Sequence, residues 1–507
     1  MKAHLMYRDR DFDPKQELPA NTPTLTQDLE LNTLLHAMAG EDPFVFDVAH
    51  KVVLSGLRND IDTILYRQAI VRDCLDNAAA VREIYDFTVA AIEAKRKNHW
   101  GGLFSNYPSA ILRGSVELLE MYRGLFKTLR HMAEAQSGQF RSEGFSTLFA
   151  MLQEELGDEY LAQVQDHLTE LKSPKGVLES VELGRGNAGT NYVLRRFPDK
   201  KGNWLDRLLG KGPPSYTFRI ADRDQAGATA LSELQDRGIH LVANALAQSV
   251  DHIVSFFEML RTELAFYVGC LNLHDLLTQK GEPTTFPAPA PTDERCLAFE
   301  GLYDVCLTLS MAAAVVGNAV NADGKNLVVI TGANQGGKSS FLRSMGLAQL
   351  MMQCGMFVGA QNFAGQICTG LFSHYKREED KSLKSGKFDE ELARMSEIVD
   401  QVTPDSVVLF NESFAATNER EGSEIARQIV RALLEKRVKV FFVTHMFELA
   451  RGLCGAYKSD ALFLRADRQP DGTRTFRLVQ GEPLATSFGE DLYRKIFGAA
   501  LEEQGQP

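Results

Sequence analysis

A glycine-rich turn separates a strand-like segment from a helix-like segment in LVVITGANQGGKSSFLRSMGLAQL, residues 327–350. The apolar, β-branched run 327–331 predicts a buried strand, and 339–354 has apolar residues at helical spacing. The turn between them, 332–339, matches G-x-x-x-x-G-K-S. In such a turn, successive backbone N–H groups face phosphate oxygens at the start of the helix. The segment therefore predicts a phosphate-binding loop.

Each residue of this loop has an expected role. Lys338 would neutralise the β- and γ-phosphates, and the Ser339 hydroxyl would bind Mg²⁺. ATP and Mg²⁺ are therefore the expected cofactors, and a glycine turn without a ligand is the less favoured alternative. The residues expected to contact the nucleotide are Gly332, Ala333, Asn334, Gln335, Gly336, Gly337, Lys338, Ser339 and Ser340.

A second strand-like run, 406–410, ends in Asn411 and Glu412. ATPases place a magnesium-side acid and a water-activating glutamate at such a position, so Glu412 is the expected general base. The alternative for Glu412 is an ordinary surface carboxylate. Asn411 stands where an aspartate is usual, and its amide supplies no charge. We therefore expect weak magnesium binding and slow turnover.

His445 follows a third strand-like run, 438–444. If these strands are parallel, His445 lies at the same sheet edge as the glycine-rich loop and could sense the γ-phosphate or the attacking water. A purely structural role for this histidine is equally open.

The sequence around these motifs alternates strands with helices such as 423–436, which predicts a parallel sheet. Asp471-Gly472 lies within 461–478 and predicts an added antiparallel hairpin. Residues 300–507 are therefore interpreted as a P-loop, ABC-like ATPase domain with a mostly parallel sheet.

The upstream sequence predicts a different organisation, so the fold class is multidomain, α plus α/β. Residues 1–28 are polar with three prolines and predict an extended lead-in. Residues 29–280 predict a helical domain that contains a strand-rich insertion at 173–222 and one or two long helices at 226–279. Residues 281–299, rich in proline, predict a linker.

Composition excludes several classes of protein. With 44% hydrophobic and 24% charged residues among 507, the chain is neither collagen-like nor wholly disordered. The net charge of −12 means that any polyanion site is local. Seven cysteines without a CxxC pair predict neither a disulfide framework nor a zinc site. The longest apolar run, 310–320, is short for a membrane helix, and no signal peptide is evident, so we expect a cytoplasmic protein without membrane association.

Two weaker motifs lie in the strand-rich insertion. Gly184–Gly189 matches G-x-G-x-x-G, but 190–197 is strand-like, which favours a turn over a dinucleotide site. A basic stretch with nearby aromatics could hold DNA phosphates, or it could be a solvated loop. Its residues are Arg195, Arg196, Lys200 and Lys201.

Four ordered blocks, at 330–360, 409–426, 441–450 and 481–489, together resemble the ATPase domain of the MutS family. Residues matching that family's motifs include Glu412, Thr417, Gly422, Ala426, Thr444, His445, Glu448 and Leu449. A fainter similarity at 59–71 resembles the helical core and lever of MutS proteins. The resemblance implies that 29–280 is a core and lever domain, in a short form without the N-terminal mismatch-recognition domain. Phe256 and Phe257 are then expected in the packing of the lever rather than as a base-stacking wedge.

The resemblance implies ATP hydrolysis coupled to DNA binding, in mismatch repair or related processing of DNA structures. The expected partners are duplex, mismatched or branched DNA, a second copy of the chain, and other DNA-repair proteins. It also implies that a serine from the second subunit completes the ATP site. Ser385 could take that role in trans, or it could be an ordinary polar loop residue. One alternative is a slow or non-hydrolysing nucleotide-gated switch that binds DNA or a protein, and another is an ABC-type energy module.

Overall fold

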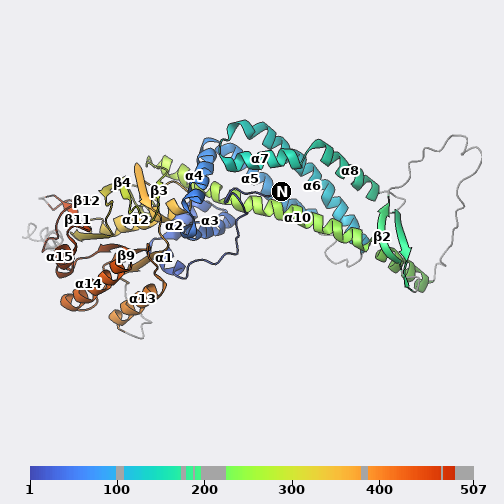
Figure 1. Ribbon diagram of the computed structural model, residues 1–507. Helices are drawn as coiled ribbons and strands as arrows, with labels where there is room; N and C mark the ends of the chain where they lie inside the picture. Colours follow the sequence, from blue (N-terminus) through green and yellow to red (C-terminus); the bar gives the residue numbers. More distant parts are fainter. Residues whose placement is uncertain are drawn as a thin grey trace, which may run out of the picture. The chain divides into compact units, whose positions relative to one another are not determined.

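The computed structural model of this chain is drawn in Figure 1. It describes residues 1–98, 108–172, 178–185, 189–195, 224–377, 386–469 and 472–485. These residues form two compact units. The first takes its residues from 1–3, 82–141 and 145–261, and the second from 4–81, 142–144 and the chain from 262 onward. The predicted boundaries at 28, 280 and 299 remain predictions.

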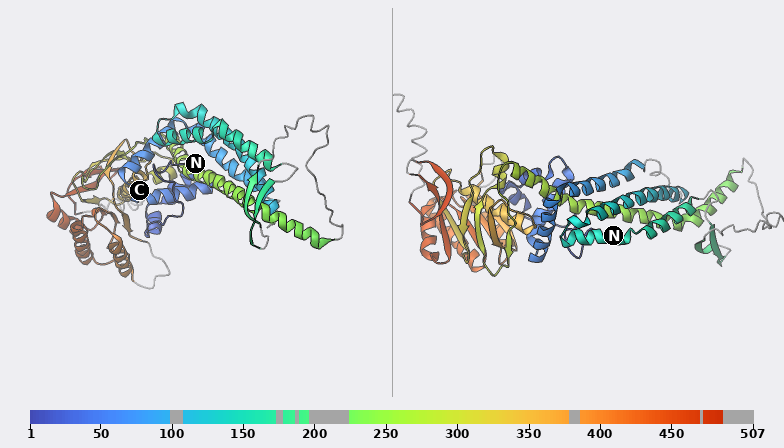
Figure 2. Two further views of the ribbon diagram at one scale, coloured as in Figure 1. Left: turned by 45° about the vertical axis from the view of Figure 1, so that its right-hand side comes forward. Right: turned by 90° about the horizontal axis from the view of Figure 1, so that it is seen from above.

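The first unit is built mainly from long helices that run alongside one another, as the views in Figure 2 agree. The helices that contribute to it are α5 (Ala78–Asn98), α6 (Pro108–Gln136), α7 (Glu143–Glu155), α8 (Asp158–Leu171) and the first part of α10 (Gln225–Gln279). The ring of Phe257 stacks on Phe126 and Tyr122 of α6, with centroids 5.5 and 5.9 Å apart. Phe256 and Phe257 are therefore core residues, and aromatic stacking fixes α10 on α6.

A small antiparallel hairpin also belongs to the first unit. It consists of β1 (Leu178–Leu183) and β2 (Gly189–Arg195). The chain thus returns as a strand after the G-x-G-x-x-G motif. A dinucleotide-binding turn would lead into a helix instead, so the hairpin agrees with the interpretation as a turn.

The second unit begins with short helices α1 (Thr22–Asp28), α2 (Leu31–Ala39) and α3 (Pro43–Ser55), the 3₁₀ turn η1 (Gly56–Arg58), and helix α4 (Ile61–Asp76). Side-chain caps start two of them: the Asp42 carboxylate accepts the Phe44 N–H at 2.8 Å, and Asp60 accepts the Thr63 N–H at 2.8 Å. The region predicted as an extended lead-in therefore contains a helix. It also contains fully buried side chains, among them those of Leu5, Met6, Phe12 and Leu25.

The main sheet of the second unit has six strands in the order β12-β11-β6-β10-β9-β8. Every neighbouring pair is parallel except β11 and β12, which form the predicted antiparallel hairpin. Val443 lies between Ile330 and Asn411 in register, so the carboxyl ends of three strands meet at one edge. The strands are β6 (Leu327–Gly332), β8 (Leu371–Tyr375), β9 (Val407–Asn411), β10 (Lys439–Val443), β11 (Ala461–Arg468) and β12 (Arg474–Gln480).

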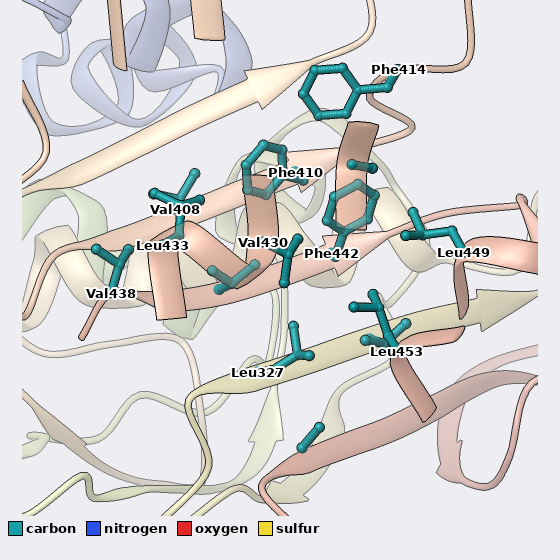
Figure 3. Packing of buried hydrophobic residues seen from close by; sticks show 14 of the residues in the cluster. Leu327, Val408, Phe410, Phe414, Val430, Leu433, Val438, Phe442, Leu449 and Leu453 are labelled. Atoms are coloured by element: carbon teal, nitrogen blue, oxygen red, sulfur yellow. The ribbon is translucent and has the colours of Figure 1, made fainter. Parts of the chain in front are cut away.

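Helices α12 (Lys338–Gln353), α13 (Lys387–Gln401), α14 (Glu419–Glu435) and α15 (Phe447–Tyr457) flank this sheet. Figure 3 shows Phe410 of β9 and Phe442 of β10 packed with Val430 of α14 and Leu449 of α15. All five residues of β10 are buried, as expected for a parallel strand covered on both faces. This packing holds the strand ends in place at the edge where the predicted site residues lie.

A second, four-stranded sheet has the order β3-β7-β4-β5, and only its β3–β7 pair is parallel. The region after residue 280 therefore combines two sheets, and the prediction of a mostly parallel sheet describes only one of them. Strand β3 lies inside the predicted linker, and Pro289 is tolerated there because β3 is an edge strand. The elements are β3 (Ala288–Ala290), β4 (Leu297–Leu302), α11 (Val305–Ser310), β5 (Asn318–Asn321) and β7 (Asn362–Gln366).

Within the ranges that the structure describes, no helix combines the length and apolar character needed to cross a membrane. All seven cysteines are free thiols.

Candidate nucleotide-binding site

The glycine-rich loop joins β6 to α12, as the sequence predicts. Gly332 has a φ of +108°, and a Cβ there would lie 2.8 Å from the backbone nitrogen of Ala466. Gly337, the N-cap of α12, has a φ of +87°, and a Cβ there would lie 3.3 Å from the carbonyl oxygen of Phe476. Both positions favour glycine, because other residues rarely adopt these angles and neighbouring backbone lies close by. The two glycines thus allow the tight turn of the loop into the start of α12.

Lys338 is the buried cation of the loop, with a 6% exposed side chain. Its ammonium donates to the carbonyl oxygens of Gly332 and Ala333 at 3.1 and 3.0 Å. Burial lowers the pKa of Lys338, and the nearby Glu412 carboxylate opposes that shift. The loop residues 334–340, which include Lys338, line a pocket of about 610 Å³ together with Glu412. A ligand in this pocket would meet a cation that is already positioned.

Ser339, which lines this pocket, lies beside Asn411 at the end of β9. The Ser339 hydroxyl donates to Oδ1 of Asn411 at 3.0 Å, which joins the start of α12 to the end of β9. Hydroxyl and amide oxygens are hard ligands of the type that Mg²⁺ accepts, so these two residues fit a magnesium site. Neither carries a charge, and the weak magnesium binding expected from Asn411 stays a prediction.

Glu412 and His445 are hydrogen-bonded to each other across the same pocket, from Nδ1 of His445 to Oε2 of Glu412. This bond is the largest cause that raises the pKa of His445. Glu412 has a φ of +55°, and its N–H donates to the carbonyl oxygen of Val443 at 2.9 Å. The backbone therefore leaves the strand direction at Glu412. The acid and the imidazole can share a proton beside the phosphate-binding loop.

Family models match two long segments of the chain. The model for the MutS2 N-terminal domain matches residues 59–280, and the model for MutS domain V matches residues 328–496. The chain belongs to the MutS family. The second match contains the glycine-rich loop, Asn411 and Glu412 at the end of β9, and His445 after β10. The resemblance seen in the sequence is therefore confirmed.

Individual relatives of this MutS-family chain align with a smaller share of its residues than the two family models together. MutS protein homolog 4 of Mus musculus is 25% identical over 51% of this chain and 26% of its own length. Endonuclease MutS2 of Thermus thermophilus is 32% identical over 33% of the chain and 23% of its own length. DNA mismatch repair protein MutS of Lactobacillus acidophilus is 28% identical over 58% of the chain and 34% of its own length. The chain thus spans about a quarter to a third of the length of these relatives.

The site of this MutS-family protein also contains residues that the sequence motifs did not indicate. Lys376 and Phe476 line the pocket of about 610 Å³ beside the glycine-rich loop, called the phosphate-side pocket below. A smaller apolar pocket of about 140 Å³ adjoins it, lined by residues that include Leu307, Gly337 and Phe476. Lys376 directly follows β8, so recognising 371–375 as a parallel strand would have placed it at this edge. Phe476 belongs to β12 and lies beside Gly337 of the loop, and no local pattern signals that contact.

Four predicted residues of this MutS-family chain, Ser385, Arg196, Lys200 and Lys201, lie outside the residues that the structure describes. Arg195 ends β2, where its Nε donates to Oγ of Ser180 at 2.6 Å and its side chain is exposed. The predicted roles of these five residues therefore stay predictions. The structure brings together the phosphate loop, Asn411, Glu412 and His445.

Proposed function

We propose that this protein binds DNA in an ATP-dependent manner and that ATP hydrolysis is coupled to DNA binding. The observation that carries this proposal is that one pocket is lined by the glycine-rich loop, Lys338, Glu412 and His445, in a chain of the MutS family. One of its relatives is named DNA mismatch repair protein MutS. We extend that activity, mismatch repair or related DNA processing, to this chain as a proposal.

ATP would bind with its phosphates on the loop. Backbone N–H groups at the start of α12 and the ammonium of Lys338 supply the positive potential that phosphate oxygens require. The apolar pocket beside Gly337, with Leu307 and Phe476 in its wall, suits a flat base. Ser339 and Asn411 would hold Mg²⁺. A bound Mg²⁺ neutralises phosphate charge.

Hydrolysis would depend on Glu412. Its carboxylate accepts a proton from water, while the water oxygen bonds to the γ-phosphorus and the bond from that phosphorus to the bridging oxygen breaks. His445 keeps the carboxylate oriented through their hydrogen bond. Lys338 holds the transferred phosphoryl group and the leaving phosphate.

The remaining parts of the proposal concern partners. We infer a homodimer in which Ser385 of one chain completes the ATP site of the other. We also infer binding of duplex, mismatched or branched DNA with phosphate contacts from the stretch 195–201, a cytoplasmic location, and partners in DNA repair. Salt-dependent DNA affinity would support the phosphate contacts.

A second candidate function keeps the fold but replaces turnover by a nucleotide-gated switch that binds DNA or a protein. Asn411 favours this candidate, because the residue paired with Ser339 supplies no negative charge to a metal. Turnover far below the rate of DNA release, with intact ATP binding, would favour the switch.

Lys338→Ala tests the site directly. The substitution removes the cation held against the carbonyls of Gly332 and Ala333, so ATP affinity in Mg²⁺ should fall at least tenfold and hydrolysis should be lost. Isothermal titration with ATP measures the first effect and phosphate release the second. Lys436→Ala, at an exposed lysine after α14, is the matched control. Parental affinity and turnover in Lys338→Ala would contradict the proposed function.

A further inference from the structure

Lys376 lies beside Asn411, one of the two residues that fit a magnesium site. It follows β8, and its backbone N–H donates to the carbonyl oxygen of Asn411 at 2.9 Å. The preceding residue, Tyr375, is paired with Asn411 in the sheet register. The exposed side chain of Lys376 lines the phosphate-side pocket with Lys338 and Ser339. Its position is therefore set by the same strand that carries Asn411.

A neighbouring pocket of about 550 Å³ shares Ser339 and Lys376 with the first and is also lined by Asn411, Arg343 and Arg377. Lys376 thus faces both sides of the Ser339–Asn411 pair. Its charge also reaches the catalytic side, where it opposes the rise in the pKa of His445.

The three cations around this second pocket differ in their partners. Arg343 donates to the carboxylate of Asp304 at 2.6 Å and pairs with Glu30 as well. Arg377 hydrogen-bonds to Gln27 and lies 3.8 Å from the Asp28 carboxylate. Their charges are met by the protein itself, with oxygen partners in fixed positions.

Lys376 has a different environment. Across the part of the chain that the structure describes, Lys376 makes no ion pair, so its ammonium can turn to an anion in the pocket. The Ser339–Asn411 pair beside it carries no charge. The net charge at this edge of the sheet is therefore more positive than it would be with an aspartate at position 411, before any metal binds.

We propose that Lys376 is a second phosphate-binding cation that supplies part of the charge neutralisation otherwise given by a divalent metal, so that this chain binds nucleoside triphosphate without Mg²⁺. The inference rests on the proposed nucleotide site. Lysine acts at phosphates as a mobile point charge, and an exposed ammonium on a flexible stem suits that role. Asn411 weakens the site for metal, and Lys376 offsets the loss.

The test measures ATP affinity by isothermal titration in Mg²⁺ and in EDTA. The parent chain should bind ATP in EDTA within about tenfold of its affinity in Mg²⁺, because Lys376 neutralises phosphate charge in either buffer. Lys376→Gln should weaken binding about tenfold in EDTA and less than about threefold in Mg²⁺. Lys376→Arg should restore binding in EDTA, and Lys436→Gln should match the parent chain. The side chain of Lys376 is exposed, so equal thermal unfolding temperatures are expected for all variants.

Two results would overturn the role of Lys376 while leaving the nucleotide site intact. One is ATP binding by the parent chain that is lost in EDTA, and the other is an equal effect of Lys376→Gln in both buffers. Failure of the proposed function has a different signature, since ATP would then bind Lys338→Ala as well as the parent chain.

Discussion

The polar backbone groups at the two ends of α12 have different surroundings. At the first turn, the backbone N–H groups and Lys338 face a pocket of about 610 Å³. At the last turn, the carbonyl of Gln353 accepts Nδ2 of Asn59 at 2.8 Å, and the carbonyl of Cys354, the C-cap residue, accepts Nη1 of Arg67 at 3.3 Å. Helix ends leave backbone groups without helical partners, and here one end is open to a ligand while the other is closed by side chains.

The hydrogen bonds around the closed end continue to the first residues of the chain. Arg67 also donates to the carbonyl of Met6 at 2.9 Å and lies over the ring of Tyr7. Glu263 of α10 accepts the N–H groups of Leu5 and Phe12 at 2.6 and 2.7 Å. One helix can thus offer a ligand site at its start and help to stabilise the fold at its end, because its two ends leave opposite backbone groups unsatisfied and have different surroundings. We therefore expect substitutions at the open end to change chemistry and those at the closed end to change stability.

Glu412→Gln should give the largest effect, at the open end. Removing the proton acceptor should lower ATP hydrolysis by roughly 100-fold or more while ATP affinity stays within a few fold. Phosphate release and isothermal titration measure the two quantities. If ATP bridges two subunits, the trapped variant should also show a dimer by light scattering in ATP and Mg²⁺.

Glu435→Gln, at the end of α14, is the control for Glu412→Gln and should hydrolyse ATP like the parent chain. Parental turnover in Glu412→Gln would contradict the general-base role. A mass that stays monomeric in every nucleotide condition would argue against a shared site.

Arg67→Ala should give the second-largest effect, at the closed end. The guanidinium is fully buried, and its loss leaves two carbonyls without their donor and a cavity beside Tyr7. The free energy of unfolding should fall by about 3–5 kcal/mol. Urea unfolding of Arg67→Ala and of the exposed control Arg58→Ala would measure this. Equal midpoints would mean that the closed end does not hold the fold together.

Glu263→Gln should alter how stability depends on pH. Burial raises the pKa of Glu263 to about 7, although three backbone N–H groups oppose that shift. Because the folded-state pKa exceeds the value of about 4.5 expected in the unfolded chain, the stabilising contribution is present below pH 4.5 and is lost as pH rises through 7. Glutamine does not titrate.

The measurement for Glu263 is urea unfolding at pH 5, 6, 7 and 8, compared between parent chain, Glu263→Gln and the exposed control Glu17→Gln. Relative to Glu263→Gln, the parent chain should lose on the order of 2–3 kcal/mol of unfolding free energy across this range. A constant difference would show that this buried carboxylate stays in one charge state.

Asn411→Asp should give the smallest effect and returns a charge to the open end. The added carboxylate beside Ser339 should lower the Mg²⁺ concentration needed for half-maximal hydrolysis and raise turnover by a few fold, because a charged oxygen binds the cation more strongly. Phosphate release over a magnesium titration checks both. An unchanged magnesium dependence would mean that position 411 does not face the metal.

Several elements followed from the sequence because their signals are local. Helix α4 (Ile61–Asp76) lies in the region predicted to be helical, because apolar residues at helical spacing are a local signal. The strand–loop–helix around Gly332 and Lys338 was predicted for the same reason. The sheet of β3, β7, β4 and β5 was not, because β7 reads NFAGQ and pairs with β4, a strand some 60 residues away in sequence. The buried Leu5 and Met6 were also missed, since their covering groups come from α4 and α10.

By itself, the sequence located the candidate site residues: the glycines that adopt a φ of +108° and +87°, Lys338, and the polar residues at strand ends. Such signals depend on backbone geometry and on short-range periodicity, which a single segment contains. Tertiary structure alone decided that Lys376 and Phe476 share that pocket and that Asn59 and Arg67 close the other end of α12. Those contacts depend on the register of strands and helices far apart in the chain, because a buried charge is tolerated only where distant segments supply its hydrogen bonds.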